Sequence, residues 1–314
     1  MSTRAPRRWA EAALACLLGA GATAPLGAQS SAGALAQACA AGAPAAVEAC
    51  RAAAAGALGL GLGSALLSSG GSLAPVPPNT LGRRLAEGGP RVALSARLLG
   101  ARVETLGPGP EQPHEQWGWG LRTGLSAGLF DGFRPVPSVG GVLSVDGFAH
   151  LDRLALGSDA VAEGAWGYGG GLRIGLLRES FTAPGVSVDL AWQRAGRLDL
   201  GTGAAPIATV EASTRSARVS VGKDLFGLGL VAGAGRDWTR LDLDVDAPGG
   251  APVSGTVEPA RDVLFVGASL NFLVVQVAGE AGWMGGASDP GLAGAPLDPG
   301  SDRLFGGLTV RLVF

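Results

Sequence analysis

Charge is scarce in this sequence, and so are long apolar runs. Only 16% of the 314 residues are charged, against roughly a quarter in an ordinary soluble domain, and the mean hydropathy is +0.30. Beyond the N-terminus the longest uncharged apolar run covers residues 52–67 and contains four glycines. A spanning helix needs about 20 apolar residues, so this run is short for one. If the chain spans a membrane it must do so as a closed β-barrel, because only helices and closed barrels satisfy every backbone hydrogen bond in lipid.

The sequence also lacks the features of several common functional classes. A formal net charge of −2 argues against a nucleic-acid partner. Only two histidines and three cysteines are present, in no spacing typical of a zinc site, so we expect no metal and no cofactor. The glycine-rich stretches lie outside any strand–turn–helix context that would bind a phosphate.

The N-terminus has the organisation of a secretory signal peptide. Arg4, Arg7 and Arg8 precede an apolar core over residues 12–22, and small residues lead to a cleavage point after Ala28. We therefore predict a signal peptide over residues 1–28 and export of the rest of the chain.

Two cysteines, Cys39 and Cys50, remain after cleavage. An exported chain meets an oxidising compartment, so an even pair is a disulfide candidate. Gly42 and Pro44 would break a helix between them and allow a short helical hairpin to bring the two sulfurs together. The alternative is a pair of buried free thiols.

The remaining chain divides into three segments. Residues 29–72 are alanine-rich and predict a helical segment that lies in the periplasm or plugs a barrel. Residues 73–90 are rich in proline and glycine and predict a linker. From residue 91 to 314, apolar residues alternate with small or polar ones, which is the period-two mark of strands with unlike faces. We predict about ten strands, near residues 91–103, 116–130, 138–152, 164–178, 185–198, 207–222, 226–246, 255–271, 274–284 and 302–314.

The polar face of these strands supplies the candidate lumen-lining residues: Arg97, Arg122, Asp146, His150, Arg173, Asp189, Arg218, Glu280 and Arg311. In two strands the apolar residues change face partway, near Thr214 and Arg236. Either β-bulges or strands that rise out of the membrane would produce such a change.

Connection lengths and aromatic residues give the barrel a direction. The predicted odd-numbered connections have 12, 11, 8, 8 and 17 residues and the even-numbered ones 7, 6, 3 and 2, as expected of long external loops and short periplasmic turns. This direction places two aromatic girdles at the membrane interfaces. The external girdle comprises Trp117, Trp119, Trp166, Trp192, Trp238 and Trp283, and the periplasmic girdle comprises Phe130, Phe226, Phe272 and Phe314.

The last twelve residues, 303–314, alternate in the same way and end in phenylalanine. They resemble the closing strand of the bacterial outer-membrane β-barrel superfamily, without pointing to a subfamily. The resemblance implies an all-β antiparallel transmembrane barrel in the outer membrane of a Gram-negative type envelope, with both termini periplasmic. It also implies two partners: outer-membrane lipid, and the barrel-assembly machinery that is thought to read the C-terminal strand. The sequence does not predict an oligomeric state.

Two functional interpretations follow. In the first, the lumen is filled by an internal network of ion pairs and the protein is a structural or surface-interaction barrel without enzymatic activity. In the second, the same charged side chains line a narrow porin-like channel for small solutes. A more distant third possibility comes from Asp146, His150 and Asp152 on one strand face, which resembles the omptins, ten-stranded surface proteases with Asp and His at the external rim.

Overall fold

The computed structural model describes residues 31–41, 43–74, 79–82, 91–106, 113–133, 141–156, 164–181, 183–201, 206–287 and 301–314. The predicted signal peptide and most of the predicted linker lie outside these residues.

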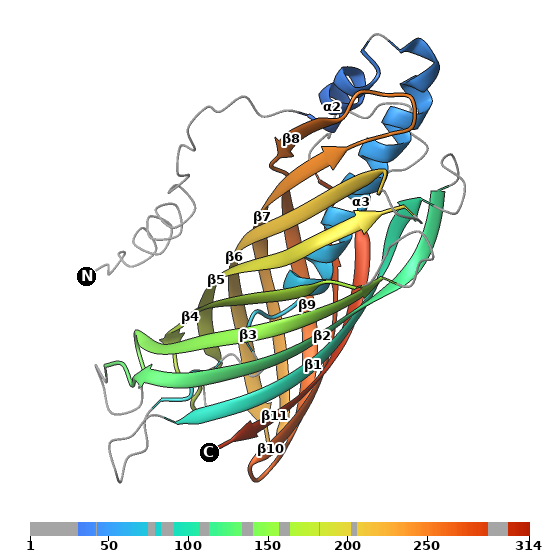
Figure 1. Cartoon of the computed structure of the whole chain (residues 1–314). Helices are drawn as coiled ribbons and strands as arrows, with labels where there is room; N and C mark the ends of the chain where they lie inside the picture. The colour runs from blue at the N-terminus through green and yellow to red at the C-terminus, as the bar shows by residue number, and fades with distance from the viewer. Residues whose placement is uncertain are drawn as a thin grey trace, which may run out of the picture.

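The described strands form one closed antiparallel barrel, as the alternating sequence predicts (Figure 1). Neighbouring strands pair in chain order, β11 pairs with β1, and the β6–β7 and β7–β9 ladders complete the ring. The short β8 and the longer β9 are separated by a break at residues 258–259, and both pair with β7. They occupy one strand position together, so the eleven strands fill ten positions around the barrel. Their bounds are β1 (Val92–Leu106), β2 (Pro113–Phe130), β3 (Ser144–Leu156), β4 (Trp166–Leu177), β5 (Gly185–Leu200), β6 (Ala208–Leu225), β7 (Leu228–Val245), β8 (Val253–Val257), β9 (Ala260–Phe272), β10 (Val275–Met284) and β11 (Arg303–Val313).

The two ends of the barrel differ in their connections. At one end, here called the loop end, residues 107–112, 157–165, 201–207, 246–252 and 285–302 join the strands. At the other, the turn end, two connections are only two residues long, 226–227 and 273–274. The predicted alternation of loop length fails at the β2–β3 connection, which is the thirteen residues 131–143. The reason is that β3 begins at Ser144, six residues later than the pattern suggested.

The outer surface of the barrel is an apolar band. Side chains such as Leu94, Leu125, Leu151, Val266 and Leu308 are about half exposed, although nothing in a soluble protein would favour such a surface. The opposite faces of the same strands are buried and carry charged and hydroxyl side chains, such as Arg122, Asp189 and Ser187. An apolar exterior around a polar interior is the arrangement of a transmembrane barrel.

The apparent change of face in β6 and β7 is not caused by bulges at Thr214 or Arg236. The β6–β7 ladder is unbroken from Ala208 to Leu225, and burial alternates regularly along both strands. Instead, inward positions become apolar toward the loop end and outward positions become charged. The strands therefore rise out of the membrane, which is the second of the two explanations considered above. The nearest register shift lies in β5, between Ala195 and Leu198.

The segment before the barrel occupies its interior. Helices α2 (Ala32–Cys39), η1 (Pro44–Ala46) and α3 (Val47–Ser69) run from the loop end into the lumen (Figure 1). The stretch Pro44–Ser69 is long and apolar enough to cross a membrane, but its apolar window is wholly buried inside the barrel. The chain then continues toward the turn end, where Leu81 contacts β3 before β1 begins at Val92.

The ends of the described chain lie on opposite sides of the barrel. Helix α2 is at the loop end, where the Ala251 N–H donates to the Cys39 carbonyl at 2.8 Å. Phe314 is at the turn end, where its N–H donates to the Val92 carbonyl at 2.9 Å (Figure 1). The sequence predicts both termini on one side of the membrane, whereas the first and last described residues lie at opposite ends of the barrel, because residues 47–74 and 79–82 extend along the lumen from the loop end toward the turn end.

Candidate functional site in the barrel lumen

The lumen has an apolar zone near the loop end, and helix α3 fills it. The wall there is made by inward-facing residues of β1, β3, β5, β6 and β7, among them Leu99, Val103, Leu154, Leu198, Val210, Leu241 and Leu243. Glycines allow the helix to approach this wall closely. A Cβ on Gly63 would collide with the Val103 side chain, and one on Gly61 would lie 2.8 Å from Leu241. An α-helix inside a barrel of this size therefore needs small residues on the faces that meet the strands.

Below the apolar zone the lumen is polar, and its wall holds four ion pairs, three between neighbouring strands and one from β1 across β11 to β10. Each arginine meets a carboxylate whose side chain is at most 3% exposed. The pairs are Arg122–Asp152, Arg173–Asp189 and Arg218–Asp237 at 2.7 Å and Arg97–Glu280 at 3.1 Å. Buried charges are tolerated only when they are paired and hydrogen-bonded, so this pairing explains how the interior holds so many of them.

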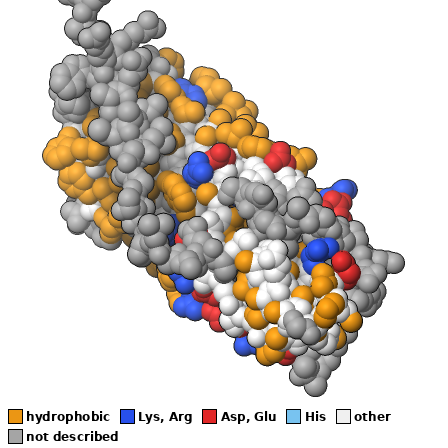
Figure 2. Space-filling view, turned by 90° about the horizontal axis from the view of Figure 1, so that it is seen from above, with side chains coloured by type: hydrophobic (Ala, Val, Ile, Leu, Met, Phe, Trp, Pro, Cys, Tyr) orange, Lys and Arg blue, Asp and Glu red, His pale blue; other side chains and the backbone are white. Residues whose placement is uncertain are grey.

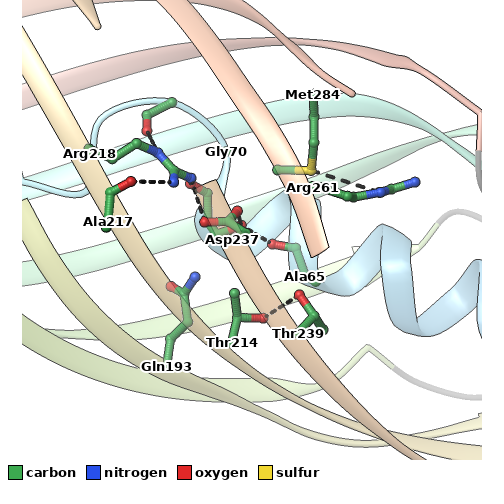
Figure 3. Close-up of polar contacts among 12 residues, drawn as sticks. Ala65, Gly70, Gln193, Thr214, Ala217, Arg218, Asp237, Thr239, Arg261 and Met284 are labelled. Carbon is green, nitrogen blue, oxygen red and sulfur yellow. Dashed lines mark hydrogen bonds and ion pairs between the residues drawn. The ribbon is translucent and has the colours of Figure 1, made fainter. Parts of the chain in front are cut away.

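The same arginines also bind the backbone where α3 ends. The last carbonyls of a helix lack intrahelical partners and carry the negative end of the helix dipole. Arg122 donates to the Ser68 carbonyl, Arg218 to the Ser69 carbonyl at 3.3 Å, and Arg97 to the Gly70 carbonyl at 2.5 Å. Figure 3 shows Arg218 and Asp237 beside this helix end. The wall thus satisfies the helix terminus that a buried position would otherwise leave without donors.

Side chains of the segment after α3 complete the polar network. The Ser69 hydroxyl donates to Asp237 at 2.6 Å, and the Ser72 hydroxyl donates to Glu280. Arg173 reaches the Ala74 carbonyl at 3.2 Å. The N-terminal segment is therefore bound by charged residues on all sides of the barrel wall.

The structure places all nine predicted lumen-lining residues inside the barrel. Seven of them join the contacts above or lie near them, whereas Asp146 and Arg311 lie closer to the turn end. Asp146 accepts a hydrogen bond from the Leu81 N–H at 2.6 Å, and Arg311 donates to Gln276 at 3.5 Å. Thr80 contacts Ser144 at 2.6 Å on the same side, so residues 79–82 pack against β3.

Two acidic partners in this network were not among the predicted lumen residues. Asp152 had been assigned to an external rim, yet it pairs with Arg122 in the interior. Asp237 was missed because the face of β7 seemed to change beside it at Arg236. Asp237 shares the inward face of β7 with Thr239, Leu241 and Leu243, at every second position. This uninterrupted spacing is the sequence signal that identifies Asp237 as a lumen residue.

His150 does not lie at a rim. Its side chain is 3% exposed, its Nε2 lies 3.5 Å from Asp152, and its ring stacks on Phe148. Asp152 in turn is held by Arg122, while Asp146 is bound to the backbone at Leu81. His150 and Asp152 therefore lie together in the buried lumen network, and Asp146 is bound separately, nearer the turn end.

Cys39 and Cys50 form the disulfide that the sequence predicts, with Cα atoms 5.8 Å apart. It closes the hairpin of α2 and α3 at the loop end, against Gly250 in the β7–β8 connection. A Cβ at Gly250 would lie 2.6 Å from the Cys39 sulfur. The hairpin therefore fits tightly beneath this connection.

The predicted girdle residues lie on the outer surface, at the two ends that the sequence assigned to them. Five of the six tryptophans are 41–65% exposed and Trp283 is half-buried. Phe130, Phe226, Phe272 and Phe314 are 43–102% exposed at the turn end. Arginines accompany two tryptophans, with Arg102 5.8 Å from the Trp117 ring and Arg153 5.3 Å from the Trp166 ring.

The barrel is closed by ten strand positions, with an apolar exterior, a charged interior and aromatic residues at both edges. This is the architecture of the outer-membrane β-barrel superfamily. No subfamily follows from these features. No protein-family model matches the sequence. No curated protein matches it either.

Several solved structures are similar to this chain at low sequence identity. The translocator domain of autotransporter NalP from Neisseria meningitidis is 12% identical, with 72% of this chain and 88% of that chain covered and a TM-score of 0.41. The outer membrane protease OmpT from Escherichia coli is 10% identical, covering 76% and 100%, with a TM-score of 0.37. Neisserial surface protein A is 10% identical, covering 72% and 99%, with a TM-score of 0.33.

Proposed function

We propose that the protein is a non-conducting outer-membrane barrel that is plugged by its own N-terminal segment and presents the α2–α3 hairpin at the cell surface. The observation that carries the proposal is the position of α3, which is buried in the lumen and held at its end by Arg97, Arg122 and Arg218. In this position α3 obstructs the route that a solute would take through the lumen. This favours a structural or surface-interaction role over a porin-like channel.

The proposed orientation puts the loop end outside and the turn end in the periplasm. Outer-membrane barrels generally have long external loops and short periplasmic turns, and the 2-residue turns here are all at one end. The C-terminal strand, which would be read by the barrel-assembly machinery, then ends at the periplasmic face. Helix α2 is consequently external, on the far side from Phe314.

The candidate surface for interaction is formed by α2, the β7–β8 connection and β8. Outside the membrane band, the strands nearby carry ion pairs on their outer faces, such as Arg194–Glu211 at 2.6 Å and Arg197–Asp199 at 2.8 Å. Figure 2, viewed from above, shows acidic and basic side chains lying next to one another on the surface. The outer surface of the barrel at the loop end is therefore suited to contact with water, whereas the lumen at the same end is apolar.

Enzymatic activity is not part of the proposal. A general base must reach its substrate, and His150 is buried in the middle of the lumen between Asp152 and Phe148. Peptide cleavage by purified protein, compared with a His150→Ala variant, would detect an activity of the omptin type. We expect no cleavage by either protein.

The orientation can be tested with peptide tags in intact cells. We expect antibody to reach a tag placed immediately before Ser31 without permeabilisation, and to reach a tag after Phe314 or within the 226–227 turn only after permeabilisation. An N-terminal tag that becomes accessible only together with the C-terminal tag would contradict the proposal, since both ends would then lie on one side.

A further inference from the structure

A row of tryptophan and arginine crosses the outer surface of three adjacent strands. In the β5–β6 ladder Trp192 lies opposite Arg215, and in the β6–β7 ladder Arg215 lies opposite Trp238. All three side chains face outward, and the two indoles are 41% and 48% exposed. Directly opposed residues on one face of a sheet have their Cβ atoms about 5 Å apart, so Arg215 is flanked by an indole on each side.

Arg215 differs from the arginines around it. Arg194, Arg236 and Arg240 occupy diagonal positions on the same outer face, and each has a carboxylate partner. These partners are Glu211 at 2.6 Å, Asp262 at 3.6 Å, and Asp242 and Glu258 at 3.3 Å. Among the residues that the structure describes, no carboxylate lies within ion-pair distance of Arg215. The charge of Arg215, unlike the charges of these three neighbours, is therefore not neutralised by a described carboxylate.

The row lies where the apolar band ends. Toward the turn end, the outward neighbours include Leu190 and Val219, both nearly half exposed. Toward the loop end, the outer face becomes charged with Glu211, Arg240 and Asp242. Tryptophan prefers the headgroup level of a membrane, so this boundary corresponds to a lipid interface. A guanidinium at that depth, with no protein carboxylate, is within reach of lipid phosphate groups.

We propose that Arg215, between Trp192 and Trp238, binds the phosphate of an anionic lipid in the leaflet at the loop end. A guanidinium can donate two parallel hydrogen bonds to phosphate oxygens, and the indole N–H groups lie at the level where they can add to them. The surrounding arginines are each paired with a carboxylate, so Arg215 supplies the positive charge that is free to meet a phosphate. This site does not depend on whether the lumen is closed.

The proposal is tested by lipid retention. Full-length protein is refolded in detergent micelles that contain equal amounts of phosphatidylglycerol and phosphatidylcholine, and bound lipids are counted by native mass spectrometry. We expect the parent protein to retain phosphatidylglycerol in preference to phosphatidylcholine. Arg215→Gln should lower phosphatidylglycerol retention several-fold. Arg215→Lys should retain an intermediate amount, because lysine keeps the positive charge but lacks the planar guanidinium that can donate two hydrogen bonds to one phosphate.

Arg102→Gln is the matched control, because Arg102 also lies beside an outward tryptophan but is paired with Glu115 at 3.4 Å. We expect this variant to retain anionic lipid like the parent. The heat-dependent gel shift of folded barrels would verify that all variants are folded. Equal retention by Arg215→Gln and the parent would overturn the proposal. So would equal retention of the two lipids by the parent, a result that requires no variant at all.

Discussion

At the residue scale, four interior arginines, Arg97, Arg122, Arg173 and Arg218, act in two ways. Each neutralises a carboxylate on another strand and donates to the backbone of the threaded segment. Arg218, for example, pairs with Asp237 and also donates to the Ser69 carbonyl. Removing one partner of such a pair leaves an uncompensated buried charge, which costs far more than loss of a pair at the surface.

Asp237→Ala tests this difference. The change removes the carboxylate of Arg218 and the acceptor of the Ser69 hydroxyl, so we expect the free energy of unfolding to fall by about 3–5 kcal/mol. Urea unfolding of protein refolded in lipid, followed by tryptophan fluorescence, measures the loss.

Asp262→Ala is its control. Asp262 pairs with Arg236 at 3.6 Å on the outer face, and both side chains are more than half exposed. We expect little change in stability. If the two variants were destabilised to the same small extent, the interior ion pairs would not have the structural role assigned to them.

Phe314 is a single residue that we expect to act during barrel assembly more than in the stability of the finished fold. Its ring is half exposed at the turn end and contributes about 2 kcal/mol or less of apolar contact to the finished fold. If the C-terminal strand is an assembly signal, Phe314→Ala should slow insertion in cells while leaving detergent-refolded protein nearly as heat-resistant as the parent. Pulse-chase measurement of folded barrel in the outer membrane checks the rate. Unchanged insertion would argue against the signal.

At the element scale, α3 depends on glycine for its fit to the wall. Replacing a helical glycine by alanine normally stabilises a helix by up to about 1 kcal/mol. At Gly63 the new methyl group would collide with Val103, so we expect Gly63→Ala to be destabilising instead. The double variant Gly63→Ala with Val103→Ala should recover part of the loss. Urea unfolding of the two single variants and the double variant decides the sign, and a stabilised Gly63→Ala protein would show that α3 does not press on β1.

The Cys39–Cys50 bridge is a second prediction for this element. Mass spectrometry of the purified, unreduced protein should find two hydrogens fewer than in the reduced chain, with no thiol available for alkylation. Two alkylated cysteines under denaturing, non-reducing conditions would show that the bridge is absent.

The strands could be predicted from the sequence more fully than their surroundings. Period-two alternation was enough to predict the ten strand positions, because an apolar exterior and a polar interior impose this alternation along most of the barrel. It became ambiguous at Thr214 and Arg236, where the interior turns apolar around α3 and the exterior turns charged outside the membrane. The same ambiguity concealed Asp237. In the third strand, the period could not distinguish the irregular connection 131–143 from the strand that follows it.

At the scale of the whole molecule, the path of residues 47–74 through the lumen could not be predicted from composition. From Ala52 onward, helix α3 is made of alanine, leucine, glycine and serine around its full circumference, which suits burial without indicating where the helix is buried. Only the barrel wall provides that information, through Val103, Val210 and Leu241 around the helix and the arginines at its end. The opposite positions of α2 and Phe314 follow from this path.

The central claim is that α3 closes the lumen, and single-channel conductance in a planar bilayer tests it most directly. Deletion of residues 29–72, with the signal peptide retained, should still give an inserted barrel, because the strands and their four wall ion pairs remain. We predict that full-length protein shows no steady conductance steps and that the deletion variant does. Steps of the same size and frequency in both proteins would contradict the account, since α3 would then not obstruct the lumen.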